Sequence, residues 1–352
     1  MQEFSTNDQL DTAPVRPGEE LDWVSLSDWI KSNIPELNGD MQVSQFHGGH
    51  ANLTYCVSFG DRALVIRRQP FGEIPPGGHD MKREYRALSG LNPVFDRAPR
   101  VFSLCEDETV IGAPFIVMER RAGVVVRVDI PAELKVHHKV EERVSFALVD
   151  AMAEFHEIDP VAAGLQKLGR PDGFVDRQLS GWYERWQLVT NTRDETFEEA
   201  YQLLKRGKPE TKRNVLVHND LKLDNCMFDP TDPDRVATIL DWDMTTIGDP
   251  LVELGTLLSY WREPGDGTNR APTIHLDMSG FPTRKALVER YARTGADVES
   301  IDWYEAFALW KQAVVLKQLF RRYETGESED QRLAAFPEFI PGQLQTAMEI
   351  LR

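Results

Sequence analysis

Two short segments carry the side chains that could do chemistry. The first is VHNDLKLDN at residues 217–225, and the second is DWD at 241–243, which follows the apolar run 237–240. Phosphoryl transfer needs a carboxylate that orients the attacking hydroxyl and oxygen ligands that hold Mg²⁺ against the phosphates. An H-x-D-x-x-x-x-N loop followed by a hydrophobic strand that ends in Asp is typical of the catalytic core of a kinase. The sequence therefore predicts a phosphoryl-transfer site built from both segments.

Five side chains of these segments have predicted roles. Asp220 is expected to orient the acceptor hydroxyl and take its proton, for which an ordinary carboxylate suffices because the transition state is loose. Asn225 on the same loop and Asp241 at the strand end are the expected Mg²⁺ ligands, since Mg²⁺ prefers hard oxygen donors. Asp243 is expected to hydrogen-bond beside the metal without binding it. Lys222 could reach the γ-phosphate, although a solvent-facing lysine fits the sequence nearly as well.

Neighbouring residues are expected to hold the backbone. His218 is predicted to position the loop, and His156, at the end of an apolar helix, is predicted to pack in the core. Asp249 is a good N-cap and Pro250 a good first residue for the helix that follows. A role for Asp249 in bracing the catalytic loop explains its position equally well.

A glycine pair lies just before the first predicted hairpin strand. Gly48, Gly49 and His50 precede Asn52, and glycines let backbone N–H groups approach phosphate oxygens while Asn52 can add a side-chain donor. A Gly-Gly pair is also a common turn filler. No Gly-Lys-Ser/Thr follows, so this is not a Walker A loop. The position of the pair favours a phosphate-binding loop.

A strand and a helix are expected to supply a supporting ion pair. Arg67 occupies the place of the strand lysine that steadies the α- and β-phosphates in kinases. Val65 shares its strand face and would cover the adenine. Glu84, on the next helix, is within plausible reach of Arg67. The alternative is a solvated arginine on an edge strand and a solvated helix glutamate.

A third segment is predicted to bind the adenine edge. Met118, Glu119 and Arg120 end the strand 115–119 and begin the connection that follows. We expect their backbone groups to form the hinge and Met118 to lie near the ring.

The elements that must position these residues follow from the pattern of apolar residues. The pattern at residues 21–34 predicts a short amphipathic helix that a proline ends. A β-hairpin is predicted for residues 43–59 and 63–67, which a Gly-Asp turn joins. Residues 80–91 and 309–323 have helical periodicity. A β-rich first third before a helical remainder predicts an α+β chain with two lobes. The expected boundaries are a flexible tail at 1–20, an N-lobe at 21–119 and a C-lobe at 120–352.

Composition excludes some classes of partner. The chain has 352 residues, of which 41% are hydrophobic, a formal charge of −17 and a sequence pI of about 5.0. This charge argues against a nucleic-acid partner, and it mildly favours neutral or cationic phosphate acceptors. An acidic enzyme can still bind ATP if Mg²⁺ and local cations offset the phosphates.

The cysteines and the apolar runs indicate a cytoplasmic protein. Cys56, Cys105 and Cys226 are scattered and form no C-x-x-C pair, so neither a zinc site nor a disulfide framework is suggested. The first twenty residues show no signal peptide. No apolar run approaches the length that spans a bilayer, so we expect no membrane partner.

Taken together, the motifs resemble the aminoglycoside phosphotransferase and choline kinase superfamily. Within it the resemblance is closest to the branch that in animals is fused to acyl-CoA dehydrogenases. It rests on motifs at 48–52, 65–68, 83–86, 117–120, 218–225 and 241–250. The resemblance implies a protein-kinase-like bilobal fold, with a small β-rich N-lobe, a larger helical C-lobe, and ATP and Mg²⁺ in the cleft.

The chain departs from the family pattern at two positions. Asn219 replaces the usual glycine of the catalytic loop, and Arg67 replaces the strand lysine of antibiotic kinases, although arginine is normal in the branch named. Family members phosphorylate hydroxyls of antibiotics, choline, sugars or hydroxyacyl groups, so the resemblance does not choose a substrate.

The leading hypothesis is an ATP-dependent O-phosphotransferase acting on a small-molecule hydroxyl. The second hypothesis is a protein kinase. Two features argue against it: DWD stands in place of Asp-Phe-Gly, and no Ala-Pro-Glu segment follows. The third is a nucleotide-binding regulator without catalysis. Acceptor selection is expected in the helical part, where Trp182, Trp186, Trp261 and Arg262 are candidates, although core packing suits each tryptophan.

Overall fold

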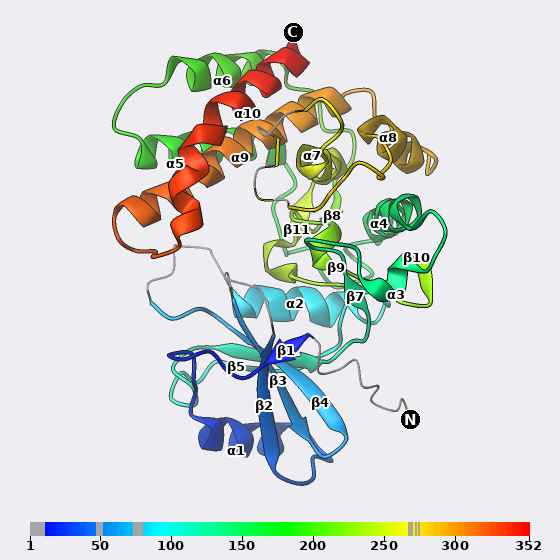
Figure 1. The fold of residues 1–352 in the computed structure, drawn as a ribbon, viewed down its shortest axis with the longest axis vertical. Coiled ribbons are helices and arrows are strands. Elements are labelled where there is room, and N and C mark those ends of the chain that lie inside the picture. Colours follow the sequence, from blue (N-terminus) through cyan, green and yellow to red (C-terminus); the bar gives the residue numbers. More distant parts are fainter. Residues whose placement is uncertain (1–10, 47–51, 73–79, 267–269, 272, 274) are drawn as a thin grey trace. The chain divides into compact units, whose positions relative to one another are not determined.

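We describe a computed structural model of the chain over residues 11–46, 52–72, 80–266, 270–271, 273 and 275–352. These residues form two compact units (Figure 1). Unit 1 runs to Gly123 and includes Ala163–Leu168 and Ala237–Thr245. Unit 2 comprises Val124–Ala162, Gly169–Val236 and Thr246–Arg352.

Unit 1 is built on a six-stranded antiparallel sheet with strand order β1-β2-β3-β4-β6-β5. The strands are β1 (Thr12–Ala13), β2 (Met41–Phe46), β3 (Leu53–Phe59), β4 (Arg62–Arg68), β5 (Val101–Cys105) and β6 (Phe115–Glu119). Phe59 pairs with Arg62, so the β3–β4 hairpin turns through two residues, as predicted. Gly60 has φ +60°, a left-handed conformation that glycine adopts without cost.

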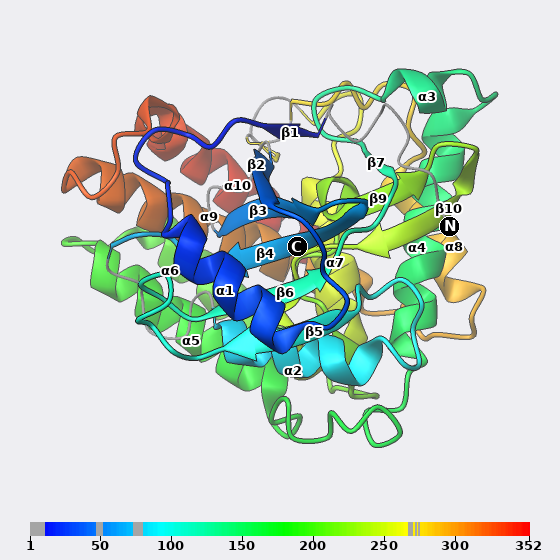
Figure 2. The same ribbon diagram turned by 90° about the horizontal axis from the view of Figure 1, so that it is seen from below.

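Two α-helices lie beside this sheet among the described residues of unit 1. Helix α1 (Trp23–Asn33) lies across one face of the sheet (Figure 2) and buries Leu26 and Ile30 among the inward side chains of β3 and β4. Helix α2 (Met81–Leu91) begins at its N-cap Asp80, whose side chain accepts hydrogen bonds from two backbone N–H groups. Both helices start with a capping aspartate, which satisfies otherwise unpaired amides.

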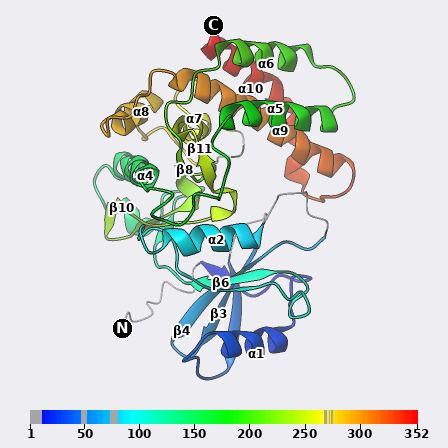
Figure 3. The same cartoon turned by 180° about the vertical axis from the view of Figure 1, so that it is seen from behind.

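Unit 2 is mainly helical (Figure 3). Helix α9 is its longest element and packs against α5, α6, α7 and α10. The helices are α3 (Ala132–Lys135), α4 (Val140–His156), α5 (Phe174–Val189), α6 (Glu195–Gly207), α7 (Pro250–Tyr260), α8 (Arg284–Ala292), α9 (Ile301–Glu324) and α10 (Phe336–Leu351). Two small sheets join them, β8 (Val215–Val217) with β11 (Thr246–Gly248), and β7 (Val124–Val125), β9 (Cys226–Asp229) and β10 (Asp232–Ile239) in the order β10-β9-β7. The last three residues of β10, 237–239, belong to unit 1.

Helix α7 contacts α9 at very short range. A Cβ atom added at Gly255 would lie 2.5 Å from the carbonyl of Tyr304, so only glycine permits this approach. One turn later the Ser259 hydroxyl accepts a hydrogen bond from Gln312 at 2.6 Å. The Asp249 N-cap accepts a bond from the Tyr304 hydroxyl at 2.6 Å. These contacts fix α7 along α9.

The predicted elements correspond to observed ones. The helices at 21–34, 80–91 and 309–323 correspond to α1, α2 and the larger, C-terminal part of α9, and the strand at 115–119 is β6. The mixed α+β class is confirmed, whereas the boundaries at 20/21 and 119/120 remain predictions. Within the expected tail, Thr12–Ala13 pairs with Phe46 and Gln45 of β2. In the described part of the chain, no helix is both long and apolar enough to cross a bilayer.

Candidate functional site

In unit 1, three carboxylates converge on one guanidinium. Arg67 Nε lies 2.9 Å from Glu84 Oε2, and Arg67 Nη2 contacts Asp241 Oδ1 and lies 3.9 Å from Asp243 Oδ2. The strand β4 therefore delivers Arg67 to the helix glutamate predicted for it. Successive side chains of a strand point to opposite faces of the sheet. Leu64 and Ile66 point into the core, and Arg67 therefore points to the other face.

The charges of this cluster do not balance. Burial alone would lower the pKa of Arg67, but Glu84 and Asp241 raise it above its ordinary value. Burial, together with the negative charges of Asp241 and Asp243, raises the pKa of Glu84 to about 7. The positive charge of Arg67 opposes this shift. Even when Glu84 is protonated, Arg67 faces two aspartates, and a divalent cation would offset the excess negative charge.

Asn52 and α2 hold the segment that carries the two aspartates. Asn52 Nδ2 donates to Asp243 Oδ2 at 3.3 Å, and Arg83 donates twice to the carbonyl of Thr245, at 2.7 and 3.1 Å. Asp241 has φ +69°, which is uncommon outside glycine but tolerated by Asp and Asn. The predicted loop residues Gly48, Gly49 and His50 lie outside the described residues.

Side chains of the segment predicted to bind adenine make contacts within unit 1. Met118 pairs with Val65 across the sheet, so these two predicted residues are neighbours. The carboxylate of Glu119 lies 2.8 Å from Arg121 Nε. The guanidinium of Arg120 lies 2.8 Å from Asp11 and contacts the thiol of Cys56. The charged ends of both residues are therefore held within unit 1, and only their backbone groups are left for the predicted hinge role.

In unit 2, the loop predicted to be catalytic gathers two further predicted residues around Asp220. Asn225 Nδ2 donates to Asp220 Oδ2 at 2.9 Å and to its carbonyl at 2.8 Å. Lys222 Nζ lies 3.0 Å from Asp220 Oδ2. Both bonds of Asn225 use its nitrogen, so its oxygen, the atom that would bind a metal, is not consumed by them. Asp220 is thereby fixed by an amide and an ammonium group.

A buried glutamate holds the backbone of the same loop. Glu253 is fully buried on α7, and its carboxylate accepts the N–H groups of His218 at 3.2 Å and Asn219 at 2.9 Å. His156 Nε2 lies 2.7 Å from the same carboxylate, and its Nδ1 lies 2.8 Å from the hydroxyl of Tyr291. Because a carboxylate only accepts, Nε2 of His156 carries a proton. We call these four side-chain and backbone contacts the Glu253 clamp.

The sequence did not reveal this clamp. His156 was expected only to pack in the core, and it is buried, but it also supports the loop through Glu253. The signal that could have found it is a glutamate inside the apolar run 251–258 of α7, where a charge is buried only with partners. His218 has the predicted backbone role, since its Nδ1 accepts from the N–H of Asp220 at 3.3 Å.

The unusual Asn219 has a backbone explanation. Its φ is +69°, in the left-handed region that glycine adopts freely and asparagine tolerates best among other residues. Asn219 can therefore replace the glycine of the family pattern without changing the course of the loop.

Lys222 is held between an acid and an aromatic ring. Burial alone would lower its pKa, but Asp220 raises it above the ordinary value. Its Nζ lies 5.0 Å from the ring centroid of Tyr260, whose own pKa burial raises to about 12. Lys222 is thus a fixed cation beside Asp220 and not a freely solvated side chain.

The donor set suits Mg²⁺ better than a transition metal. Within the described residues, no three His, Cys, Asp or Glu side chains are grouped so that they could hold a metal alone. Asp241 in unit 1 has a carboxylate oxygen, and Asn225 in unit 2 has an amide oxygen. Mg²⁺ commonly takes one or two protein oxygens and completes its shell with water and phosphate oxygens, so each of these side chains is by itself a donor of the kind that Mg²⁺ prefers.

Two of the four residues considered for acceptor selection make contacts within the protein. Trp186 stacks on Phe197 at 4.1 Å between ring centroids, and Arg262 donates to the carbonyl of Leu276 at 3.0 Å. Trp182 is buried, with Arg185 and Lys311 over its ring. Trp261 is buried and lines a pocket.

Comparison with known proteins gives a consistent family. A model described as the phosphotransferase enzyme family matches residues 42–287. Acyl-CoA dehydrogenase family member 11 of Rattus norvegicus is 30% identical over 338 residues, which are 92% of this chain and 43% of that protein. The chain spans between 30% and 45% of the length of the curated relatives it matches.

Solved structures share the fold. A protein provisionally named an aminoglycoside phosphotransferase, from Ralstonia eutropha, has a TM-score of 0.77 at 26% identity over 94% of this chain and 98% of that one. A thermostable mutant of an aminoglycoside phosphotransferase, in complex with AMP-PNP and hygromycin B, has a TM-score of 0.57 at 16% identity over 93% and 98%. The expected protein-kinase-like fold is confirmed. The family model covers well over half of the residues, and the chain therefore belongs to the phosphotransferase enzyme family.

Proposed function

We propose that the protein is an ATP-dependent O-phosphotransferase that moves the γ-phosphate to a hydroxyl of a small molecule. The observation that carries the proposal is the arrangement of Asp220, fixed by Lys222 and Asn225 on a loop held by Glu253. A preorganised carboxylate of this kind is what phosphoryl transfer needs, because the protein mainly positions the groups. The family assignment supports the same reaction class.

In this proposal Asp220 is the base. It orients the acceptor hydroxyl and takes its proton, while a bond forms between that oxygen and the γ-phosphorus. The bond from that phosphorus to the bridging oxygen breaks, and ADP leaves. Lys222 lies beside Asp220 and offsets negative charge on the transferring group. Asn225 and Asp241 would hold Mg²⁺, which supplies charge neutralisation at the phosphates.

Unit 1 is proposed to bind the nucleotide. Arg67, steadied by Glu84, is a buried permanent cation suited to the α- and β-phosphates. The Gly48, Gly49, His50 and Asn52 segment is proposed to contact the phosphates, and Val65, Met118 and the backbone of Glu119 and Arg120 to contact the adenine. A protein of similar fold binds AMP-PNP, which agrees with this role. The proposal requires that Asp241 of unit 1 and the loop of unit 2 act on one phosphoryl group.

The experiment is a screen of alcohols for ADP release with ATP and Mg²⁺, followed by phosphorus NMR of the product. Asp220→Asn keeps the shape of the side chain and should lower turnover by about 10²–10⁴-fold with little change in ATP affinity. Asp234→Asn, which alters an exposed ion pair with Arg143, is the matched control and should keep full activity. Wild-type turnover by the Asp220 variant would remove Asp220 from the role of base. ATP binding without turnover of any alcohol would favour a regulator.

A further inference from the structure

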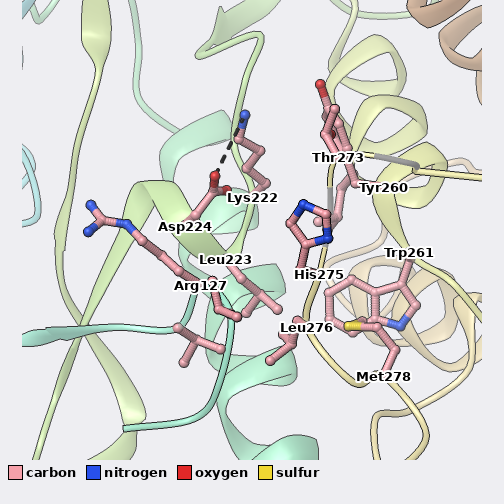
Figure 4. Close-up of a pocket in the computed structure, with 13 residues that line it drawn as sticks. Arg127, Lys222, Leu223, Asp224, Tyr260, Trp261, Thr273, His275, Leu276 and Met278 are labelled. Carbon is pink, nitrogen blue, oxygen red and sulfur yellow. Dashed lines mark ion pairs between the residues drawn. The ribbon is translucent and has the colours of Figure 1, made fainter. Parts of the chain in front are cut away.

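A pocket in unit 2 opens beside the catalytic loop (Figure 4). It contains about 610 Å³ of space that no atom fills, part of which is open to solvent. Its walls come from the catalytic loop, the end of α7, the segment after β7 and the chain that precedes α8. The lining residues are Val126, Arg127, Val128, Lys222, Leu223, Asp224, Leu257, Tyr260, Trp261, Thr273, His275, Leu276 and Met278.

One wall of the pocket includes the lysine that pairs with the proposed base. Lys222 lines the pocket, and its Nζ lies 3.0 Å from Asp220 Oδ2. Tyr260, on the opposite wall, lies under the same ammonium group. A molecule in the pocket could therefore present a hydroxyl to Asp220 past the Lys222 side chain.

The lining is mostly hydrophobic. Leu257, Trp261, Leu276 and Met278 are all less than 10% exposed and face the cavity. Figure 4 shows Trp261, Leu276 and Met278 gathered at one end, away from the Lys222 ammonium group. A site with an apolar end and a polar end selects a ligand of the same two-part character.

The charged residues of the lining do not suit a polycation. Asp224 is the single carboxylate among the lining residues, and its Oδ2 lies 4.0 Å from Lys222 Nζ (Figure 4). Arg127 and Lys222 contribute two positive charges. An aminoglycoside carries several ammonium groups, each of which would need an anionic partner when desolvated. Lys222 already lies 4.0 Å from Asp224 and 3.0 Å from Asp220, so neither carboxylate is left over to pair with several ammonium groups.

We propose that this pocket binds the hydrophobic group of the acceptor alcohol, with the hydroxyl directed to Asp220, and that polycationic aminoglycosides are not acceptors. The identity of the ligand as a phosphate acceptor rests on the proposed function. Binding of a hydrophobic alcohol in the pocket does not, so the two ideas can fail separately.

Binding of linear alcohols from 1-butanol to 1-octanol to the nucleotide-free full chain tests the pocket. Each methylene buried should tighten binding about fourfold, until the pocket is full. Calorimetry would measure the affinities. In Met278→Gln, which keeps the length of the side chain but adds polar atoms, the gain per methylene should shrink. Met41→Gln, on a partly exposed residue of unit 1, is the matched control and should bind like the wild type.

Several outcomes would overturn the assignment of the pocket. These are affinity that does not depend on chain length, equal gains per methylene in the wild type and in Met278→Gln, or competition between hygromycin B and 1-octanol. If Met278→Gln does not fold, the chain-length series and the hygromycin competition on the wild type decide. Chain-length-dependent binding that persists while ATP and Mg²⁺ phosphorylate no alcohol would support the pocket and count against the proposed function.

Discussion

Replacement of Glu253 tests whether a buried carboxylate sets the position of the catalytic loop. In Glu253→Ala, two backbone N–H groups and the His156 imidazole lose their acceptor in a fully buried place. A buried donor without a partner costs about 1–3 kcal/mol, and breaking a buried charged contact costs about 3–5 kcal/mol. We therefore expect a loss of about 3–5 kcal/mol in the free energy of unfolding, a large share of the usual stability of a domain.

Glu253→Gln is the more informative variant because it keeps the size of the side chain. One oxygen remains to accept. The new NH₂ group faces the Asn219 N–H if it replaces Oε1, or both the His218 N–H and His156 Nε2 if it replaces Oε2, so at least one contact becomes donor against donor. The expected loss is about 1–3 kcal/mol. Asp220 then shifts with its backbone, and a misplacement of about 1 Å costs about 100-fold in rate.

The assay combines urea unfolding with ADP release, under conditions where each variant is folded. For Glu253→Gln we expect kcat to fall while the dissociation constant for ATP changes little. Glu305→Gln weakens another buried ion pair of unit 2, with Arg270 at 2.6 Å, and should lose stability without a comparable loss of kcat. If Glu253→Gln had wild-type stability and wild-type kcat, the clamp would not position the loop.

Three further predictions follow from the site. Saturation with ATP and Mg²⁺ should raise the melting temperature, since a ligand at 100 times its dissociation constant stabilises the native state by about 2.7 kcal/mol; an unchanged melting temperature at millimolar concentrations would argue against nucleotide binding. Asp241→Ala should weaken Mg²⁺-dependent nucleotide binding more than Asp243→Ala, and equal losses in Mg²⁺ titrations would show that Asp243 is also a ligand. Asn219→Gly should leave the unfolding free energy nearly unchanged, whereas Asn219→Ala should lower it by about 1–2 kcal/mol because its φ is positive; equal stabilities of the two variants would refute the backbone explanation.

Local signals in the sequence were sufficient for much of the fold. Helices α1 and α2 were predictable because each has a capping aspartate and an apolar stripe, and the Gly60 turn set the register of its hairpin. The Arg67–Glu84 pair was also predictable, since strand alternation fixes the face of Arg67 and the helix follows shortly after.

Contacts between distant parts of the chain were not predictable in the same way. Glu253 and His156 are separated by 97 residues, and no local pattern encodes which buried charge meets which. The strand β1 consists of two residues, too few for any alternation to be visible. The side chain of Arg120 pairs with Asp11, which belongs to a segment expected to be a tail.

Helix α7 makes different contacts on its two faces, and this limits insertions and deletions within it. Glu253, Leu257 and Tyr260 are spaced four and three residues apart and share one face, which serves the clamp and the pocket, while Gly255 and Ser259 on the opposite face fix the helix to α9. Inserting or deleting one residue between 253 and 260 would rotate everything beyond it by about 100°. Tyr260 would then leave the pocket wall while Glu253 stayed in place. Insertions and deletions should therefore be excluded from this stretch in functional variants, whereas point substitutions at Leu257 could change the acceptor without disturbing the loop.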